Sequence, residues 1–244
     1  MLVSAGERQL PQPALKRGDE PAVTSVDHRL ASELRGFGLV GIAAILIILA
    51  GNLLVAPLSA MLVLLWVYLS RTPWREIGYV RPKNWITTAA LGIVFGVTLK
   101  LVMKAIVMPL LGAPPVNQAF HYLAGNRAAI PAALWMMIVV AGFGEEILYR
   151  GYMFERLGKL FGKSIVAKSA TVLITSVLFG LLHYPVQRLP GAEQAMITGL
   201  IFGTIFAITG RIWMLMVTHA AFDLTAYALI YWNLETSVAH SIFR

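Results

Sequence analysis

Residues 36–70 read GFGLVGIAAILIILAGNLLVAPLSAMLVLLWVYLS and contain no charged side chain. A helix that crosses a bilayer needs roughly 20 mostly apolar residues. This segment is therefore too long for one ordinary span and just long enough for two short ones. Gly51, Asn52 and Pro57 are turn or kink signals, which divide it near Asn52. The segment predicts two spanning helices.

The rest of the chain continues this apolar pattern. Residues 128–144 and 169–182 are also uncharged, and 58% of the 244 residues are hydrophobic while only 13% are charged. We therefore predict an all-α, polytopic transmembrane helical bundle of seven or eight spans over residues 36–232. The five spans beyond the first two are expected near Trp85–Leu111, Ala129–Gly162, Ile165–His183, Ala192–Thr209 and Ile212–Trp232.

Both ends of the chain are polar. Residues 1–35 contain three prolines and balanced charge, without the basic start and apolar core of a signal peptide. We expect a flexible amino-terminal tail there and a short carboxyl-terminal tail at residues 233–244. The chain has no nucleic-acid-binding motif, so its net charge of +8 is attributed to basic cytoplasmic loops.

Basic residues indicate the orientation. The linker at 71–84, the segment at 156–168 and Arg211 are basic, whereas the opposite loops hold only Arg127 and Arg188. With seven spans the three basic segments share one side, which the positive-inside rule makes cytoplasmic. We expect a multi-pass protein of the plasma membrane with its amino terminus in the cytoplasm.

Ionisable residues interrupt the apolar segments. A charge near the centre of a spanning helix costs on the order of 2.5–3.5 kcal/mol to insert, so such residues mark pairs or functional sites. Lys100 and Lys104 are expected to extend toward the interface instead. The remaining interruptions are Glu145, Glu146, His183, His219 and Asp223.

The two adjacent glutamates receive different predictions. Glu146 and Arg150 stand four residues apart, share a helix face and can form an ion pair. Glu145 lies about 100° around the helix from Glu146 and has no evident partner in its own helix. Glu146 and Arg150 are therefore expected to support the site, and Glu145 to be free for chemistry.

The histidines show the same four-residue spacing. Phe179 can pack against the imidazole of His183, and Asp223 can orient His219. The helical rise from the connecting turns brings Glu145, His183 and His219 to similar depths. We expect them around one cavity nearer the cytoplasmic side.

Two mechanisms of amide hydrolysis use this set. The chain has no Cys, no Gly-x-Ser-x-Gly and no His-Glu-x-x-His, which excludes thiol, serine-elbow and zincin chemistry. In the first mechanism, Glu145 and His183 activate water while His219 and Asp223 serve the carbonyl and the oxyanion. In the second, Glu145, His183 and His219 bind a zinc ion that carries the water.

Three motifs carry a family resemblance. They are EEILYRGY at 145–152, FGLLH at 179–183 and HAAFD at 219–223. Together with the linker at 71–85 they resemble the motifs of the CPBP family, also called the CAAX protease or Abi family. The resemblance covers about residues 70–232. It implies a helical intramembrane endopeptidase whose motif core lies at 129–232.

The resemblance also implies roles and partners. Glu145 and His183 would act on water without a cofactor, and His219 and Asp223 would form the oxyanion side. Asp223 stands where the family has Asn or Asp, and an ionised carboxylate cannot donate a hydrogen bond. The implied partners are the lipid bilayer and a membrane-associated peptide or protein, of CAAX type or another.

Two other functions stay open. Buried Glu, His and Arg also line transport and proton pathways, although the sequence shows no paired repeats with broken helices. A non-catalytic membrane scaffold or immunity protein would keep the same motifs without cleaving peptides. Changing Glu145 or His183 separates these functions from proteolysis, because only a protease loses cleavage.

Overall fold

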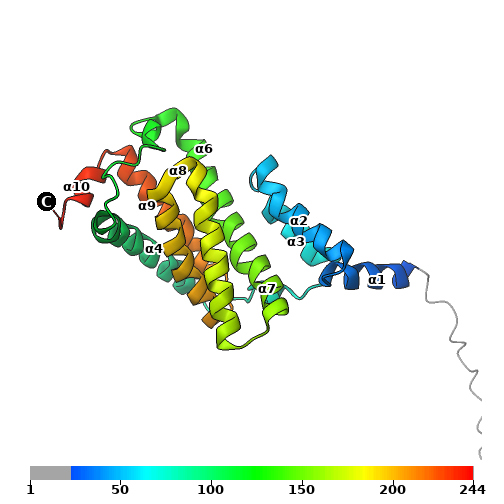
Figure 1. Cartoon of the computed structure of the whole chain (residues 1–244). Coiled ribbons are helices and arrows are strands. Elements are labelled where there is room, and N and C mark those ends of the chain that lie inside the picture. The colour runs from blue at the N-terminus through cyan, green and yellow to red at the C-terminus, as the bar shows by residue number, and fades with distance from the viewer. Residues whose placement is uncertain (1–22, 244) are drawn as a thin grey trace, which may run out of the picture.

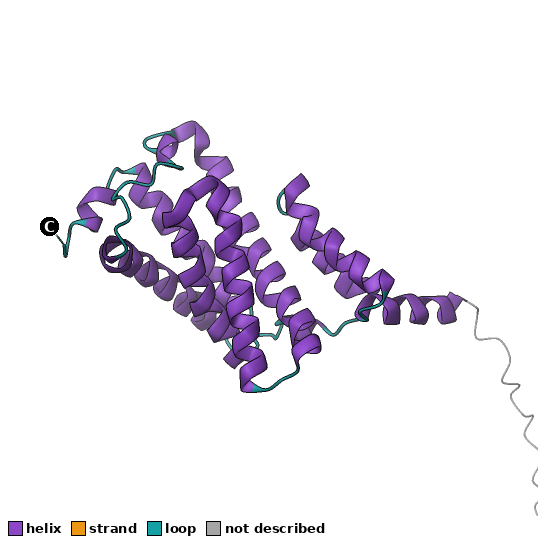
Figure 2. Ribbon diagram, in the orientation of Figure 1, coloured by secondary structure: helices purple, strands orange, loops and turns teal. Residues whose placement is uncertain are grey.

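The computed structural model describes residues 23–243, which form helices and connecting loops without a strand (Figure 2). The predicted all-α class is confirmed. Short elements join into longer rods, notably α4 with η2 and α5, and η4 with α6, η5, η6 and α7. The elements are α1 (Val23–Arg35), α2 (Leu39–Leu54), α3 (Leu58–Leu69), η1 (Trp74–Ile77), α4 (Trp85–Val102), η2 (Met103–Val107), α5 (Met108–Leu110), η3 (His121–Leu123), η4 (Arg127–Ala129), α6 (Ile130–Trp135), η5 (Met136–Glu145), η6 (Ile147–Met153), α7 (Phe154–Phe161), α8 (Ile165–Thr209), α9 (Trp213–Tyr231) and α10 (Glu235–Ala239).

The structure supports an integral membrane protein, but it does not confirm seven or eight spans. Among the described residues, four helices are long and apolar enough to cross a membrane. The count rises to five if His28–Arg35 and Leu39–Leu54, bent by 65°, form one span. The four are Trp85–Leu110, Arg127–Phe161, Ile165–Thr209 and Trp213–Tyr231.

Helix α8 explains part of the difference. It contains both of the spans expected at 165–183 and 192–209, and its only non-helical residue is Arg188, with φ 56° and ψ −162°. A Cβ atom at Gly180 would lie 2.8 Å from the Ala192 carbonyl oxygen, so the two halves pack against each other. Helix α8 is therefore a hairpin of two antiparallel halves (Figure 1).

The two halves of this hairpin approach each other closely at Gly199 and Gly203. A Cβ atom at Gly199 would lie 3.1 Å from the Ser176 Cα, and one at Gly203 would lie 3.3 Å from Val172 Cγ1. These two glycines therefore let the two halves pack closely.

The uncharged segment at 36–70 forms two helices, but the two spans expected there are not confirmed, because Leu58–Leu69 is shorter than a span and Leu39–Leu54 counts only together with His28–Arg35. The chain turns at residues 55–57, slightly beyond the expected division at Asn52. The backbone N–H of Asn52 donates to Ser59 Oγ, and the backbone N–H of Ser59 donates to Asn52 Oδ1, both at 2.9 Å. This reciprocal pair joins α2 to α3 and satisfies backbone donors at the turn.

The expected amino-terminal tail is helical in its described part. Residues 1–22 lie outside the described residues, whereas residues 23–35 form α1. The Trp66 indole donates to the Leu34 carbonyl at 3.1 Å, and the Arg156 guanidinium donates to the Arg35 carbonyl at 3.0 Å. These contacts satisfy carbonyls at the end of α1 and fix it to the bundle.

The 71–84 linker is tied to the start of α9. The Ile212 amide donates to the Gly78 carbonyl at 3.0 Å, and the Tyr79 ring meets the Trp213 ring edge-on at 5.0 Å. Burial raises the pKa of Tyr79 to about 12, so its hydroxyl stays neutral near pH 7. The linker thereby fixes the helix that carries His219.

Helices α4 and α9 run side by side in the same direction (Figure 1). A Cβ atom at Gly92 would lie 2.9 Å from Val217 Cβ, and one at Gly96 would lie 2.9 Å from Ala221 Cβ. The two glycines let the backbones approach closely. This contact places the second half of α4 beside the polar residues of α9.

Candidate active site

Glu145 and His219 come from different helices and face each other. Glu145 Oε2 lies 3.7 Å from His219 Nε2. The helices carrying them meet closely at Gly142, where a Cβ atom would lie only 2.8 Å from Ala220 Cβ. The missing side chain at Gly142 therefore allows the carboxylate and the imidazole to meet.

The imidazole of His219 is held by Glu146. His219 Nδ1 lies 2.8 Å from Glu146 Oε1, and an ionised carboxylate can only accept, so Nδ1 donates. His219 Nε2 then faces both Glu145 Oε2 and Asp223 Oδ2, each at 3.7 Å. The ring is fixed with one nitrogen in a structural bond and the other between two carboxylates.

Glu146 also forms the ion pair expected with Arg150. Arg150 Nη1 donates to Glu146 Oε1 at 2.8 Å, and the two side chains are 2% and 0% exposed. Arg150 Nη2 reaches the Gly199 carbonyl at 3.4 Å. The guanidinium also lies 5.1 Å from the centre of the Phe179 ring. The pair therefore links η5 and η6 to both halves of α8.

His183 lies in the first half of α8 and is half-buried. Its Nδ1 is 2.7 Å from the Phe179 carbonyl oxygen. A carbonyl can only accept, so Nδ1 donates and the neutral ring keeps a free lone pair on Nε2. The Phe179 ring meets the imidazole edge-on at 4.5 Å. His183 is close enough to Glu145 for the two groups to interact electrostatically.

Two carboxylates stay partly accessible. The Glu145 side chain is 21% exposed and the Asp223 side chain is 28% exposed. Among the described residues, Glu145 Oε2 has no hydrogen-bond partner although the atom is buried. Buried polar atoms are nearly always paired, so this oxygen is available to water or to a substrate.

The donor set expected for zinc does not fit a bound ion in this arrangement. Within residues 23–243, no group of three or more His, Asp or Glu side chains has a geometry that could hold a metal. Glu145, His183 and His219 therefore do not form such a group.

The expectation for Lys100 and Lys104 is wrong. Lys100 Nζ donates to Gln194 Oε1 at 3.0 Å, and its side chain is buried. Lys104 Nζ donates to the Pro115 carbonyl at 2.6 Å and pairs with Glu235 at 2.9 Å. Both ammonium groups have partners inside the protein, so neither needs to reach the interface. Glu235 opens α10, within the segment expected to be a tail.

Sequence reasoning missed the bond between Glu146 and His219. It assigned the orientation of His219 to Asp223, which stands one turn away in the same helix. The residue that holds Nδ1 is 73 positions distant, and no spacing rule connects the two. The Phe202 ring, 5.7 Å from that imidazole, was missed for the same reason.

The backbone around the glutamates is π-helical. Both η5 and η6 have this wider form, where a regular α-helix was expected. Such segments are rare and frequently occur at functional sites.

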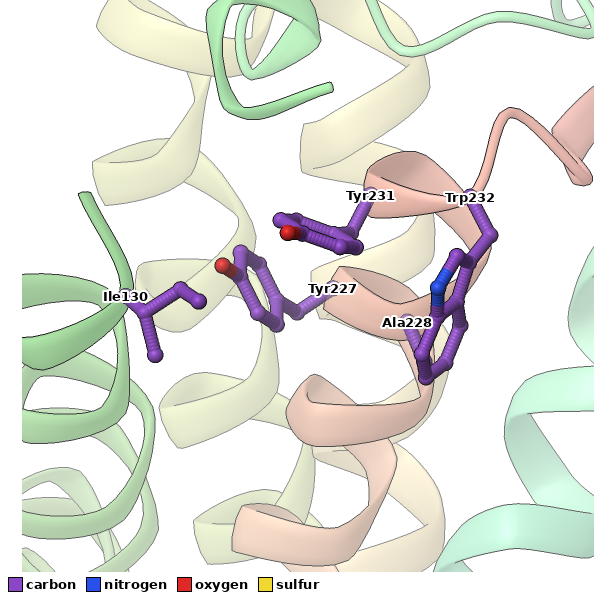
Figure 3. A pocket seen from close by; sticks show the side chains of 5 residues that line it. All are labelled: Ile130, Tyr227, Ala228, Tyr231 and Trp232. Atoms are coloured by element: carbon purple, nitrogen blue, oxygen red, sulfur yellow. The ribbon is translucent and has the colours of Figure 1, made fainter. Parts of the chain in front are cut away.

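A separate apolar pocket lies at the far end of α9 (Figure 3). Tyr227 and Tyr231 point from α9 toward Ile130 at the start of α6. None of the four candidate catalytic residues lines it. The pocket is therefore distinct from the Glu145 site.

Comparison with known families agrees with the motifs. Residues 127–225 match the family model described as type II CAAX prenyl endopeptidase Rce1-like. The matched segment contains all four candidate catalytic residues. No curated protein and no solved structure matches the chain. The match supports the assignment of this chain to the CPBP family of CAAX proteases.

Proposed function

We propose that this protein is an intramembrane endopeptidase that hydrolyses a peptide bond with water activated by Glu145 and His183. The observation that carries the proposal is the buried, unbonded Oε2 of Glu145, which faces His219 Nε2 at 3.7 Å. The family match at 127–225 supports protease activity, and the residue roles are our inference from the geometry.

Water activation would use two acceptors. Glu145 Oε2 has no competing hydrogen bond among the described residues. His183 commits Nδ1 to the Phe179 carbonyl, which leaves Nε2 to accept a proton. A water between the carboxylate and this imidazole would be deprotonated as it attacks the carbonyl, and the proton would pass to the leaving amine.

The other side of the site would stabilise the oxyanion. With Nδ1 bonded to Glu146, a protonated His219 presents Nε2–H toward the space between Glu145 and Asp223. A preorganised donor at that position stabilises the negative charge of the tetrahedral intermediate. Asp223 would line this side of the site. Its carboxylate cannot donate a hydrogen bond, so it would orient the substrate by accepting one.

The substrate we propose is a membrane-associated peptide or protein. The matched family is named for CAAX prenyl endopeptidases, so a prenylated Cys-aliphatic-aliphatic-X peptide is the first probe. We also propose the plasma membrane as location, a cytoplasmic amino terminus, and α8 as two separate crossings. Water activation in this scheme needs no metal or other cofactor.

Comparison of membrane peptides from cells with the unaltered chain and with Glu145→Ala tests the function without assuming a substrate. We expect specific cleavage products with the unaltered chain and their loss with Glu145→Ala at equal protein levels. Glu76→Gln, an exposed carboxylate far along the chain, serves as the control and should keep the products. Identical peptide sets from the unaltered and Glu145→Ala cells would refute proteolysis and favour a scaffold, immunity or transport role.

A further inference from the structure

Lys100 is a buried cation that the proposed mechanism does not use. Its side chain on α4 is only 6% exposed. Its ammonium donates to the neutral amide of Gln194 at 3.0 Å and lies 4.8 Å from the centre of the Phe222 ring. A buried ammonium without an anionic neighbour is costly, so its charge requires a partner.

The packing of α4 on α9 supplies that partner. Gly96 packs on Ala221, and Lys100, one helical turn later, lies over Phe222. The next residue is Asp223, whose carboxylate attracts the Lys100 charge more strongly than Glu235, the other carboxylate acting on it. The ion pairs of the described residues include no direct contact between the two, so the attraction acts through space.

Asp223 needs such a partner as much as Lys100 does. Its carboxylate lies 3.7 Å from His219 Nε2, where the oxyanion would form. A second carboxylate, Glu145, lies at the same distance from that nitrogen. Without compensation, the charge of Asp223 would repel the developing oxyanion.

We propose that Lys100 is a positioning residue that balances the charge of Asp223 and so allows an aspartate to stand beside His219 in the active site. The proposal rests on the proposed function. It concerns a residue outside the family match at 127–225.

Lys104 provides a matched control on the same rod. It stands one turn beyond Lys100, is largely buried, and pairs directly with Glu235 at 2.9 Å. Its charge is therefore already satisfied by a direct partner on α10. Replacing both members of this pair removes a cation and an anion together.

A double-mutant cycle tests the pairing of Lys100 with Asp223. Lys100→Met keeps the length of the side chain and removes the charge. We expect it to lower kcat on a prenylated Cys-aliphatic-aliphatic-X peptide on the order of tenfold, with KM nearly unchanged. In the Asp223→Asn background the same change should cost much less, because the neutral amide needs no counter-charge.

Two controls separate charge from packing. Lys100→Arg keeps the cation and should retain most of the activity. The double change Lys104→Met with Glu235→Gln should change kcat by the same factor in the native background and in the Asp223→Asn background. Equal losses from Lys100→Met in both backgrounds, or no loss in either, would overturn the proposal.

The melting temperature of the purified protein gives an independent readout of the same cycle. We expect Lys100→Met to lower it more in the native background than beside Asp223→Asn. Additive shifts would refute the charge pairing. If the unaltered chain cleaves no peptide, the proposed function fails and the role of Lys100 in catalysis fails with it. Non-additive shifts would then still establish the pair itself.

Discussion

Glu146 is the residue on which the geometry of the site depends most. One of its oxygens accepts from both Arg150 Nη1 and His219 Nδ1, each at 2.8 Å. This carboxylate joins a buried cation to the imidazole of the proposed oxyanion side. One side chain therefore forms a structural ion pair and also orients a proposed catalytic group.

Glu146→Gln should reduce stability and activity together. The change leaves Arg150 charged and buried without its anion, which typically costs about 3–5 kcal/mol. Chemical unfolding of the purified protein in mixed micelles measures the loss. Joint replacement by Glu146→Leu and Arg150→Met should cost less than the sum of the single changes. A loss below about 1 kcal/mol for Glu146→Gln would contradict the buried pair.

The chemistry at Glu145 is expected to be independent of metal. The residues expected for zinc do not form a metal-binding group within the described chain, and the proposed water activation by Glu145 and His183 uses no metal. Dialysis of the purified protein against a zinc chelator should leave cleavage of the prenylated peptide unchanged. Loss of activity that returns on adding zinc would instead favour the second mechanism.

At the scale of single elements, close helix approach decides where the site forms. Gly142 brings η5 against Ala220 of α9, whereas Gly158 in α7 has no other atom within 4 Å of a Cβ position. Both glycines belong to the rod Arg127–Phe161. The same substitution can therefore be compared at Gly142, where the packing is crowded, and at Gly158, where it is open.

Gly142→Ala should destabilise the protein and impair cleavage. The added methyl group would meet Ala220 Cβ at 2.8 Å, and overpacking of this kind costs about 1–3 kcal/mol. Separation of the helices would also lengthen the distance between Glu145 and His219. Gly158→Ala should be neutral or stabilise by about 0.5–1 kcal/mol. Equal melting temperatures for the two variants would contradict this packing.

Helical elements could be predicted from the apolar runs, and their exact form could not. The runs at 36–70 and 169–182 lack charge and are long enough to be helices, which the structure bears out. The π-helical form of η5 and η6 and the continuation of α8 beyond Pro185 depend on contacts between helices. Local sequence does not encode those contacts, so spacing rules could not find them.

At the scale of the whole molecule, the sequence predicted the class but not the number of spans. Hydropathy shows how apolar a segment is, but it does not show where one helical element ends and the next begins. Helix α8, for example, contains two of the expected spans. The same limit applies to the site. The order of the three motifs was enough to predict Glu145, His183, His219 and Asp223 as site residues. The hydrogen bond between Glu146 and His219 joins segments 73 positions apart, so only the three-dimensional structure could reveal it.

Orientation can be tested because the chain contains no cysteine. Single changes at exposed positions outside the candidate spans, Lys163→Cys, Arg211→Cys and Tyr122→Cys, would each create one reactive thiol. With a cytoplasmic amino terminus, an impermeant maleimide added to intact cells should label only Tyr122→Cys. Labelling of all three after permeabilisation is the control. Labelling of Lys163→Cys or Arg211→Cys in intact cells would contradict the orientation.

The most direct measurement is peptide cleavage by the purified protein reconstituted in liposomes, with Glu145→Gln and His183→Gln compared with the unaltered chain. Each change gives a side chain of similar length and removes a group that can take a proton from the proposed water site. Both variants should fold normally and lose at least about a hundredfold in kcat, as expected for a general base. Glu193→Gln, on the second half of α8, should retain activity. Full cleavage by Glu145→Gln would contradict a water-activating carboxylate at this position.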